Sequence, residues 1–182
     1  MEAKECIRNR RSIRKFSDRP VERSVIEAAV ETASFAPSWK NTQVTRYIVV
    51  DNKELKDKIA DECCSSNHNG GIIKEAPVLV ATTMVEKRSG YERDGSFSTS
   101  KEKGWQMFDC GIATQSFALA LFDQGVDTLI MGIFDIERAT ELLNVPEGQE
   151  IAALIAVGYR SEDQEVAAPP RKTVEQLVSY AE

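Results

Sequence analysis

The stretch from Trp105 to Phe122 constrains the fold more than any other, because it is apolar on nearly every side. Small residues separate its large apolar ones, which are Trp105, Met107, Phe108, Cys110, Ile112, Phe117, Leu119, Leu121 and Phe122. A helix that lacks a polar face has to be buried, either inside a domain core or against a second subunit. The chain therefore folds around this helix or uses it to pair with another copy.

Four other segments have the composition of β-strands. They are rich in β-branched and aromatic residues, and they span Val44–Val50, Pro77–Met84, Asp127–Phe134 and Ile151–Val157. The second is a nearly continuous apolar run, which predicts a central strand covered on both faces. Gly132 falls inside the third, where a glycine often lets a ligand or another backbone approach closely.

Shorter helices are predicted around these strands. Their expected spans are Ala3–Arg10, Glu22–Ser34, Lys53–Cys63, a helix from its Asp135 cap to Leu143, and one from the Thr173 and Gln176 capping box through Tyr180. Helices that separate strands in a chain of 182 residues predict a single α/β or α+β layered domain over residues 1–182. The order of the strands is not readable from this pattern.

Two polar segments interrupt the pattern. Residues 65–71 are rich in Ser, Asn and Gly, which predicts a loop that ends the preceding helix. Residues 86–104 contain only Tyr91 and Phe97 as large apolar side chains among many Gly, Ser, Lys, Glu and Arg. A polar segment of this length inside a compact domain is usually a cover over a site or a disordered excursion. We expect a mobile lid at residues 86–104.

Composition narrows the functional classes. The formal net charge of -6 argues against general binding to nucleic acid, since phosphate contacts require a basic face. The longest uncharged apolar run, Cys110–Phe122, is too short to cross ~30 Å of hydrocarbon, and no signal peptide is recognised. The four cysteines have neither metal-ligand spacing nor the pattern of a disulfide framework. These features predict a soluble cytoplasmic protein with no nucleic-acid or membrane partner.

One basic cluster runs against this acidic total. Residues 8–15, Arg-Asn-Arg-Arg-Ser-Ile-Arg-Lys, carry five positive charges at the end of the first predicted helix. A helix C-terminus favours cations whatever their function, and an anionic ligand is the alternative cause. Arginine suits bidentate contacts with phosphate, and a second basic pair, Arg171 and Lys172, lies late in the chain. If the two basic places meet in the fold, they can hold one phosphate of a small ligand.

Few side chains are candidates for catalysis. His68 is the one histidine and lies in a polar loop, so neither a Ser-His-Asp triad nor a multi-histidine metal site is predicted. Cys63 and Cys64 lack a second ligand pair and are interpreted as buried thiols. The sequence also lacks a P-loop and a Rossmann fingerprint. A cofactor that carries its own reactivity is therefore the natural hypothesis, with the protein supplying binding and electrostatics.

Four segments together resemble the nitroreductase family of FMN-dependent oxidoreductases, over almost the whole chain. They are Arg-Arg-Ser-Ile-Arg-Lys-Phe at 10–16, Ala-Pro-Ser-Trp-Lys-Asn-Thr-Gln at 36–43, the stretch from Gly125 through Gly132, and Gly158-Tyr159 followed by Pro170-Arg171-Lys172. Two departures concern the surroundings of the pocket. Val44-Thr45 stands where the family has Pro-Trp, and Arg160 stands where it has proline. Both leave the class of substrate open.

The resemblance implies an α+β fold with a central, mostly antiparallel sheet flanked by helices, in an intertwined homodimer. FMN would lie at the subunit interface, and the residues implied to bind it are Arg10, Arg11, Ser12, Arg14, Pro37, Ser38, Trp39, Asn41, Gln43, Ile130, Met131, Gly132 and Arg171. Among them, Arg10, Ser12 and Arg171 would hold the phosphate. Arg14 would lie near N1 of the ring, and residues 36–43 would line the ring from the partner subunit. No catalytic side chain and no metal are expected.

The implied activity is ping-pong transfer of a hydride from NAD(P)H, through flavin N5, to an electron-poor small molecule such as a nitroaromatic, quinone or enone. Two alternatives keep the fold and the FMN. One is a flavin-fragmenting or dehalogenating relative, and the other is a non-enzymatic protein that stores or senses FMN. A third alternative is a soluble domain whose basic turn binds nothing.

Overall fold

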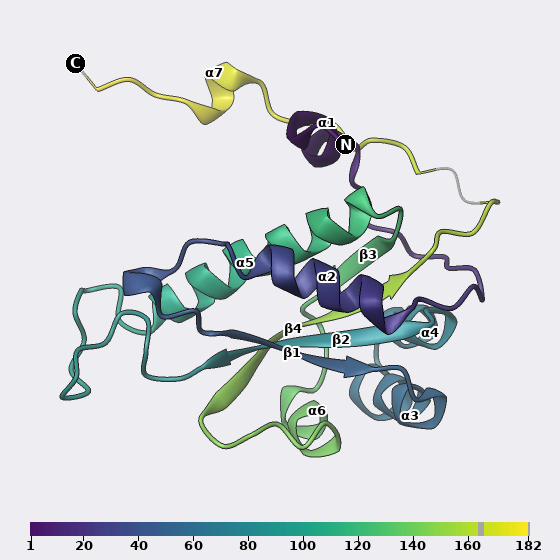
Figure 1. The fold of residues 1–182 in the computed structure, drawn as a ribbon, viewed down its shortest axis with the longest axis horizontal. Helices are drawn as coiled ribbons and strands as arrows, with labels where there is room; N and C mark the ends of the chain where they lie inside the picture. The colour runs from purple at the N-terminus through teal and green to yellow at the C-terminus, as the bar shows by residue number, and fades with distance from the viewer. Residues whose placement is uncertain (164–165, 182) are drawn as a thin grey trace.

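The computed structural model describes residues 1–163 and 166–181 of the chain. Within them, four strands form one antiparallel sheet in the order β1-β2-β4-β3 (Figure 1). The strands are β1 (Thr45–Val50), β2 (Val78–Val85), β3 (Asp127–Met131) and β4 (Gln149–Gly158). The expected antiparallel sheet is thereby confirmed. Strand β2 lies inside it, as its apolar run indicated.

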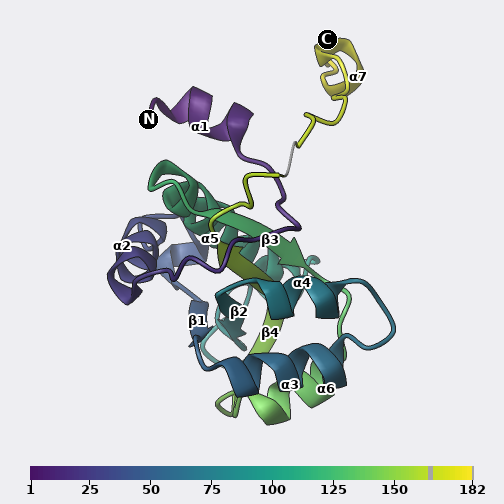
Figure 2. The same ribbon diagram turned by 90° about the vertical axis from the view of Figure 1, so that its right-hand side faces the viewer.

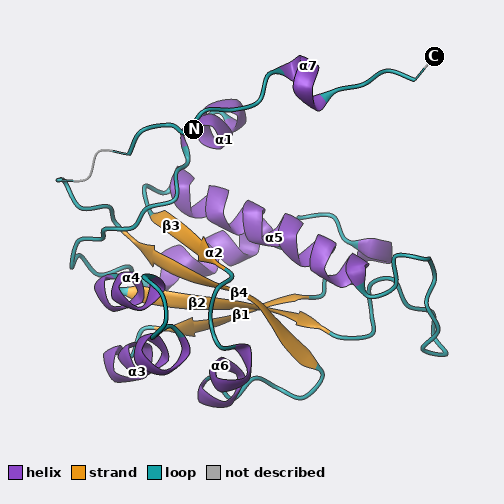
Figure 3. Ribbon diagram, turned by 180° about the vertical axis from the view of Figure 1, so that it is seen from behind, coloured by secondary structure: helices purple, strands orange, loops and turns teal. Residues whose placement is uncertain are grey.

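Helices cover both faces of the sheet (Figures 2 and 3). On one face lie α2 (Arg23–Ala33) and α5 (Gly104–Asp123), and on the other α3 (Lys53–Cys63), α4 (Asn69–Glu75) and α6 (Ile136–Leu142). Alternate residues of β2 belong to the two layers: Leu79 packs in the core under α3, and Val80 packs in the core under α2 and α5. A strand buried on both sides has no solvent face, which explains its unbroken apolar sequence. The architecture is α+β.

Helix α5 has a buried part and an exposed part. Phe117 and Leu121 are fully buried against the sheet. Nearer the N-terminus of the helix, the side chain of Met107 is 47% exposed and that of Phe108 is 59% exposed. Burial in the domain core therefore accounts for the second half of this apolar helix, whereas the first half presents apolar side chains to the exterior.

Helix α4 corrects the expectation of a loop over residues 65–71, because the helix begins at Asn69. Contacts with α3 explain it. A Cβ atom on Gly70 would lie 2.9 Å from the carbonyl oxygen of Ala60, so only glycine permits this close packing. The buried amine of Lys56 donates to three carbonyl oxygens at the C-terminal end of α4 and complements the negative end of that helix. Tertiary contacts thus override a loop-like composition.

Two element boundaries also differ from expectation. Strand β3 ends at Met131, so Gly132 follows the strand and does not lie inside it. The last helix, α7 (Val174–Leu177), has its expected capping box but ends before Tyr180. Every described residue from 167 to 181 is exposed, so no packing extends this short helix beyond one turn.

Both ends of the chain lie outside the two helical layers (Figures 1 and 3). Helix α1 (Ala3–Asn9) is tied to the C-terminal end of α5, where the amino group of Met1 lies 2.6 Å from the carboxylate of Asp123. Residues 167–181, here called the C-terminal arm, extend away from the sheet. Their exposed apolar side chains include Val174, Leu177, Val178 and Tyr180.

Candidate functional site

The basic turn, residues 10–14, directly follows α1 and brings together arginines from both ends of the chain. Arg11 donates to the backbone carbonyls of Arg8 (2.5 Å) and Arg10 (2.9 Å). The pKa of Arg10 is lowered, first by burial of its guanidinium and then by the positive charges of Arg11 and Arg171. The late arginine therefore comes close enough to the early cluster to act on it electrostatically, in line with the hypothesis from the sequence.

The sheet fixes the position of the basic turn. Ser12 pairs with Thr128 of β3 as a parallel bridge, and the Ile13 N–H donates to the carbonyl of Thr128 (3.1 Å). The side chain of Ile13 is fully buried, whereas Arg14 beside it is exposed. A buried anchor thus holds a turn whose guanidinium groups reach the surface.

An ion pair between a buried carboxylate and an exposed arginine lies at the start of β3, next to this turn. The carboxylate of Asp127 is 4% exposed and accepts two hydrogen bonds of 2.7 Å from Arg160. Asp127 also acts on Arg10, where its charge opposes the neighbouring arginines by raising the pKa. The sequence analysis missed Asp127, because one acid among 29 carries no spacing signal. One sequence feature could have indicated this pair: Arg160 stands where the family has proline.

Within the described residues, the arginines of this site form no ion pair with a carboxylate. Among the ion pairs of the described residues, none involves an arginine of the basic turn or Arg171. The next cation along the chain, Lys15, does pair with Asp163 at 2.8 Å. The carboxylate of Asp127, which acts on Arg10, is already bonded to Arg160, and it raises the pKa of Arg10 less than Arg11 or Arg171 lowers it. A bound anion relieves the remaining repulsion between the guanidinium groups. The cluster therefore fits a phosphate group.

The second motif forms the left-handed turn, residues 38–43. Its backbone has positive φ at three residues that are not glycine: 47° at Lys40, 56° at Asn41 and 47° at Gln43. Each costs on the order of 1–3 kcal/mol, and such strain is typical of binding and active sites. Within the turn, the hydroxyl of Ser38 accepts a hydrogen bond from the Gln43 N–H (2.9 Å). Asn41 and Gln43 are exposed, so neither is held by packing in the core.

Trp39 begins a short 3-10 helix that ends at Asn41. Its indole ring lies 4.9 Å from the ring of Trp105, between centroids. Its indole nitrogen is buried without a hydrogen-bond partner in the described part of the chain. Asp109 of α5, only 3% exposed, accepts a hydrogen bond from the backbone N–H of Trp39 (2.9 Å). Sequence analysis missed Asp109 as well, because this bond joins positions 70 residues apart.

A cavity of about 610 Å³ lies beside the left-handed turn. Helix α2 and strand β1 form its walls, and Pro37, Ser38, Gln43 and Asp109 also line it. Its size is within the usual range for sites that bind small molecules. Three residues implied by the family resemblance therefore border a cavity of suitable volume.

The end of β3 contributes a third set of implied residues. The side chain of Ile130 is 41% exposed, whereas Met131 is buried in the core, so only its backbone can face a ligand. At Gly132, no atom of the described residues, apart from its chain neighbours, lies within 4 Å of the position that a Cβ would take. This end of the strand is open, and Ser12 of the basic turn is bridged to the same strand at Thr128.

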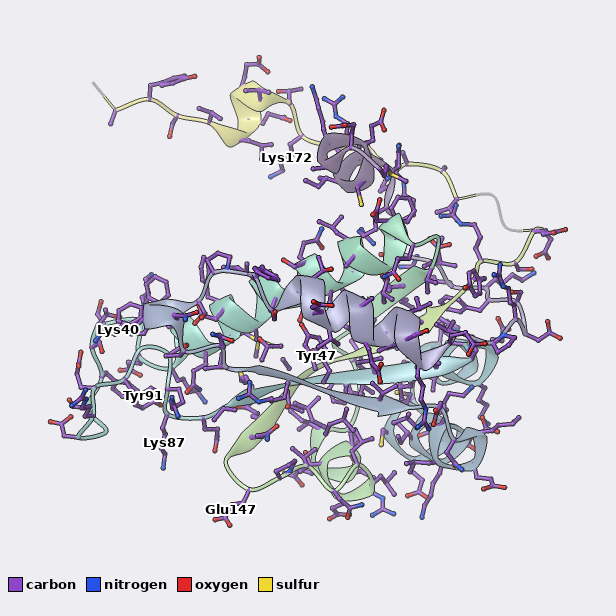
Figure 4. All side chains as sticks on the ribbon, in the orientation of Figure 1. Lys40, Tyr47, Lys87, Tyr91, Glu147 and Lys172 are labelled. Carbon is purple, nitrogen blue, oxygen red and sulfur yellow. The ribbon has the colours of Figure 1, made fainter. Side chains whose placement is uncertain are left out.

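The two turns lie at opposite ends of α5. The left-handed turn is bonded to Asp109, whereas the basic turn is bridged to Thr128, just beyond the C-terminal end of α5 at Asp123. Asp109 and Asp123 are 14 residues apart on the helix, or about 21 Å at 1.5 Å per residue. Figure 4 shows Lys40 of the left-handed turn and Lys172, the neighbour of Arg171, at different ends of the molecule. One chain holds both halves of the implied site but does not join them.

Other chemistries find little support in the described residues. No group of three His, Cys, Asp or Glu side chains could hold a metal there, and no helix there is long and apolar enough to cross a membrane. His68 is exposed. All four cysteines are free and buried, as interpreted for Cys63 and Cys64. Burial raises the pKa of Cys63 to about 11, which keeps that thiol protonated at neutral pH.

Comparison with known proteins places the chain. The model of the Nitroreductase family matches residues 7–72 and 65–159, which together are most of the sequence. The chain belongs to the nitroreductase family. The resemblance drawn from the four segments is thereby confirmed, and so is the expectation of an oxidoreductase.

Individual relatives agree with this assignment. A protein of Methanothermobacter thermautotrophicus, described as an NADH dehydrogenase/NAD(P)H nitroreductase, is 29% identical over 90% of this chain and 80% of its own length. The structure of a nitroreductase family protein from Streptococcus pneumoniae superposes with a TM-score of 0.83 at 21% identity, covering 97% of this chain and 98% of that one. An FMN-dependent nitroreductase from Clostridium difficile gives 0.76 at 22% identity, covering 96% of each chain. The last two establish the fold.

Proposed function

We propose that the protein is an FMN-dependent oxidoreductase that takes hydride from NAD(P)H and passes it to an electron-poor small molecule, such as a nitroaromatic, quinone or enone. One observation carries the proposal: Arg10 and Arg11 gather with Arg171 from the other end of the chain, and the ion pairs of the described residues leave all three without a carboxylate. The phosphate of FMN supplies the negative charge that this cluster lacks. The names of two relatives support the choice of FMN and NAD(P)H.

The basic turn would bind the phosphate end of the cofactor. Arg10 and Arg171 would hold phosphate oxygens through bidentate hydrogen bonds, with Ser12 adding a hydroxyl donor from a backbone fixed to β3. Arg14, which is exposed, would reach toward the ring and stabilise negative charge near N1. The exposed edge at Ile130 and Gly132 would face the ring beside it.

The left-handed turn would line the ring, from a second copy of the chain. Because the two turns of one chain lie toward opposite ends of α5, we propose a homodimer in which the basic turn of one protomer meets the left-handed turn of its partner. Exposed apolar side chains at Met107 and Phe108 and along the C-terminal arm support such an interface. Two equivalent sites would result.

Bound FMN would supply the hydride chemistry, so the protein needs no acid, base or nucleophile of its own. Its residues bind the phosphate, hold the ring and present positive charge beside it. Donor and acceptor would occupy the same space in turn, which makes ping-pong kinetics the expected pattern.

Three expectations from the sequence remain proposals. Residues 1–182 form one domain, and residues 86–104 form a lid next to the left-handed turn. An ion pair of 3.3 Å between Lys40 and Glu92 supports that placement. The free thiols support a cytoplasmic location.

The test is a visible absorption spectrum of the purified protein, followed by anaerobic titration with NADH and NADPH and reoxidation with a panel of acceptors. We expect flavin absorbance, bleaching by a nicotinamide, and recovery with a nitroaromatic or quinone. A protein that gains neither flavin absorbance nor thermal stability with added FMN contradicts the proposal.

The same experiment separates the alternatives. A protein that binds FMN but is not reduced by either nicotinamide above the rate of free FMN would be a storage or sensing protein. Breakdown of the flavin under oxygen, seen by product analysis, would indicate a flavin-fragmenting enzyme. Unchanged FMN binding after Arg10→Ala and Arg171→Ala would contradict the assignment of the basic turn.

A further inference from the structure

The left-handed turn needs a structural cause, because three adjacent or nearly adjacent residues hold an unfavourable backbone conformation. Lys40, Asn41 and Gln43 are all exposed, so core packing does not impose their positive φ angles. Residues persist in such conformations only when the surrounding structure over-determines them. The hydrogen bonds around the turn should therefore identify what holds it.

Those bonds converge on one buried carboxylate. Oδ2 of Asp109 accepts from the backbone N–H of Trp39 (2.9 Å) and from the hydroxyl of Ser89 (2.5 Å). The hydroxyls of Ser89 and Thr42 are themselves hydrogen-bonded at 2.6 Å. These four residues are called the Asp109 network. It grips the left-handed turn at both ends, through the backbone of Trp39 and the side chain of Thr42.

The network also fastens residues 86–104 to the turn. Ser89 belongs to that segment and is fully buried. Nearby, Lys40 pairs with Glu92 at 3.3 Å, and Glu92 accepts a hydrogen bond from Ser98 (2.6 Å). The hydroxyl of Ser98 and the ammonium of Lys40 hold the pKa of Glu92 below its usual value. The segment and the turn are thus attached by a buried contact and by an exposed one.

On the basis of the proposed FMN site, we propose that Asp109 is a positioning residue, which holds the left-handed turn in the conformation that receives the flavin ring and couples it to residues 86–104. Asp109 also borders the cavity, but in this role it acts through the backbone of the turn. A buried carboxylate that accepts a backbone N–H and a hydroxyl on one oxygen is well suited to it, because charge-assisted hydrogen bonds are stronger than neutral ones.

If Asp109 positions the left-handed turn, its removal should change the affinities for FMN and riboflavin in the same way. FMN and riboflavin share the ring and differ in the phosphate, so a defect at the left-handed turn should weaken both equally. We expect Asp109→Ala to weaken each by about tenfold, and Asp109→Asn, which keeps an acceptor oxygen, to recover part of the loss. Ser89→Ala keeps the bond to Trp39 and should cost both flavins about threefold. The circular dichroism of the bound flavin should change in Asp109→Ala.

The matched control is Asn52→Ala, on the opposite side of the sheet. The side chain of Asn52 also accepts from a backbone N–H, that of Leu55 (2.8 Å), at the start of α3. Its removal should destabilise the fold to a similar degree but leave both flavin affinities and the flavin spectrum unchanged. If Asn52→Ala lowers flavin affinity as much as Asp109→Ala does, then Asp109 contributes only to the general stability of the fold.

Hydrogen exchange in the flavin-free protein tests the positioning role separately from the proposed function. Asp109→Ala should speed exchange of the amides of Trp39 and Gln43 by more than about tenfold, without similar change in the sheet. The inference is overturned if Asp109→Ala folds and the exchange of these two amides is unchanged. It is also overturned if the variant loses affinity for FMN but not for riboflavin. If Asp109→Ala does not fold, Ser89→Ala and Asp109→Asn decide by the same criteria. If exchange is faster in Asp109→Ala but the parent protein binds no flavin, the proposed FMN site is contradicted, whereas the role of Asp109 in holding the left-handed turn is supported.

Discussion

The basic turn and the left-handed turn are the two halves of the proposed site, and they differ in what makes each of them specific. In the basic turn the backbone is ordinary and anchored through buried Ile13, and the specific feature is positive charge that no ion pair among the described residues neutralises. In the left-handed turn the charges are paired, as for Lys40 with Glu92, and the specific feature is a strained backbone held by Asp109. Under the proposed function, one region would receive an anion through electrostatics, and the other would receive a flat ring through its shape.

This difference predicts different dependences. Binding by charge should respond to salt, to the ligand's phosphate and to nearby carboxylates. Binding by shape should be indifferent to salt and sensitive to the hydrogen bonds that hold the backbone. The following variants are chosen to disturb one region and spare the other.

The largest effect is expected from Arg10→Ala combined with Arg171→Ala. Each change removes charge-assisted hydrogen bonds to the phosphate, so FMN affinity should fall by at least about a hundredfold. Riboflavin affinity should stay within about twofold. Fluorescence titration with both flavins measures this. The control is Arg138→Ala, an arginine that pairs with Glu62 and Glu141. Equal losses for the two flavins would mean that the basic turn does not bind phosphate.

Arg160→Ala should have the next largest effect. It leaves the buried carboxylate of Asp127 without its two hydrogen bonds, and that charge can then attract Arg10 away from a phosphate. We expect FMN affinity to fall about tenfold with little change for riboflavin. Adding Asp127→Asn should restore it, because the competing charge is gone. A double variant as weak as the single one would show that Arg160 itself binds the ligand.

Salt should separate the two regions without a mutation. Raising ionic strength from about 0.05 M to about 0.5 M screens charges at the exposed basic turn, so FMN should bind about fivefold more weakly. Riboflavin should be nearly unaffected. The expected consequence is that the ratio of the two affinities falls with salt in the parent protein. In the variant that lacks Arg10 and Arg171 the ratio should stay constant.

The smallest effect on FMN affinity is expected from a change at Gly158, which packs against the segment that carries the basic turn. A Cβ at Gly158 would lie 2.6 Å from Cδ of Pro77 and 2.9 Å from Cδ1 of Phe16, at the end of the segment that carries the turn. Gly158→Ala should therefore cost about 1–3 kcal/mol of stability, measured by denaturant unfolding, and weaken FMN slightly. Gly71→Ala, where no neighbour lies within 4 Å, is the control and should leave stability unchanged or raised.

Local patterns made much of the fold predictable. The amphipathic run from Lys53 to Cys63 became α3 with the expected bounds, because the Asn52 cap and the apolar stripe act within one segment. The apolar run at β2 indicated its place inside the sheet for a similar reason. The prediction of a loop through residue 71 was wrong, because the stability of α4 comes from contacts with Lys56 and Ala60 on a different helix.

The site divides in the same way. The motif residues and their charges could be read from the sequence, because each motif is continuous. Asp127 and Asp109 could not, because their partners are distant along the chain: Arg160 lies 33 residues from Asp127, and Trp39 lies 70 from Asp109. The left-handed backbone at Lys40 and Gln43 was equally invisible, since neither residue type signals a positive φ.

Subunit complementation tests the central claim most directly, namely that each site joins the basic turn of one copy to the left-handed turn of another. The Arg10→Ala, Arg171→Ala chain and the Asp109→Ala chain are co-expressed with different tags, and the mixed dimer is isolated. In that dimer one site should carry both defects and the other none. We predict about one FMN per two chains, bound with the affinity of the parent protein. If no site of parental affinity appears, the two turns act within a single chain and the account is contradicted.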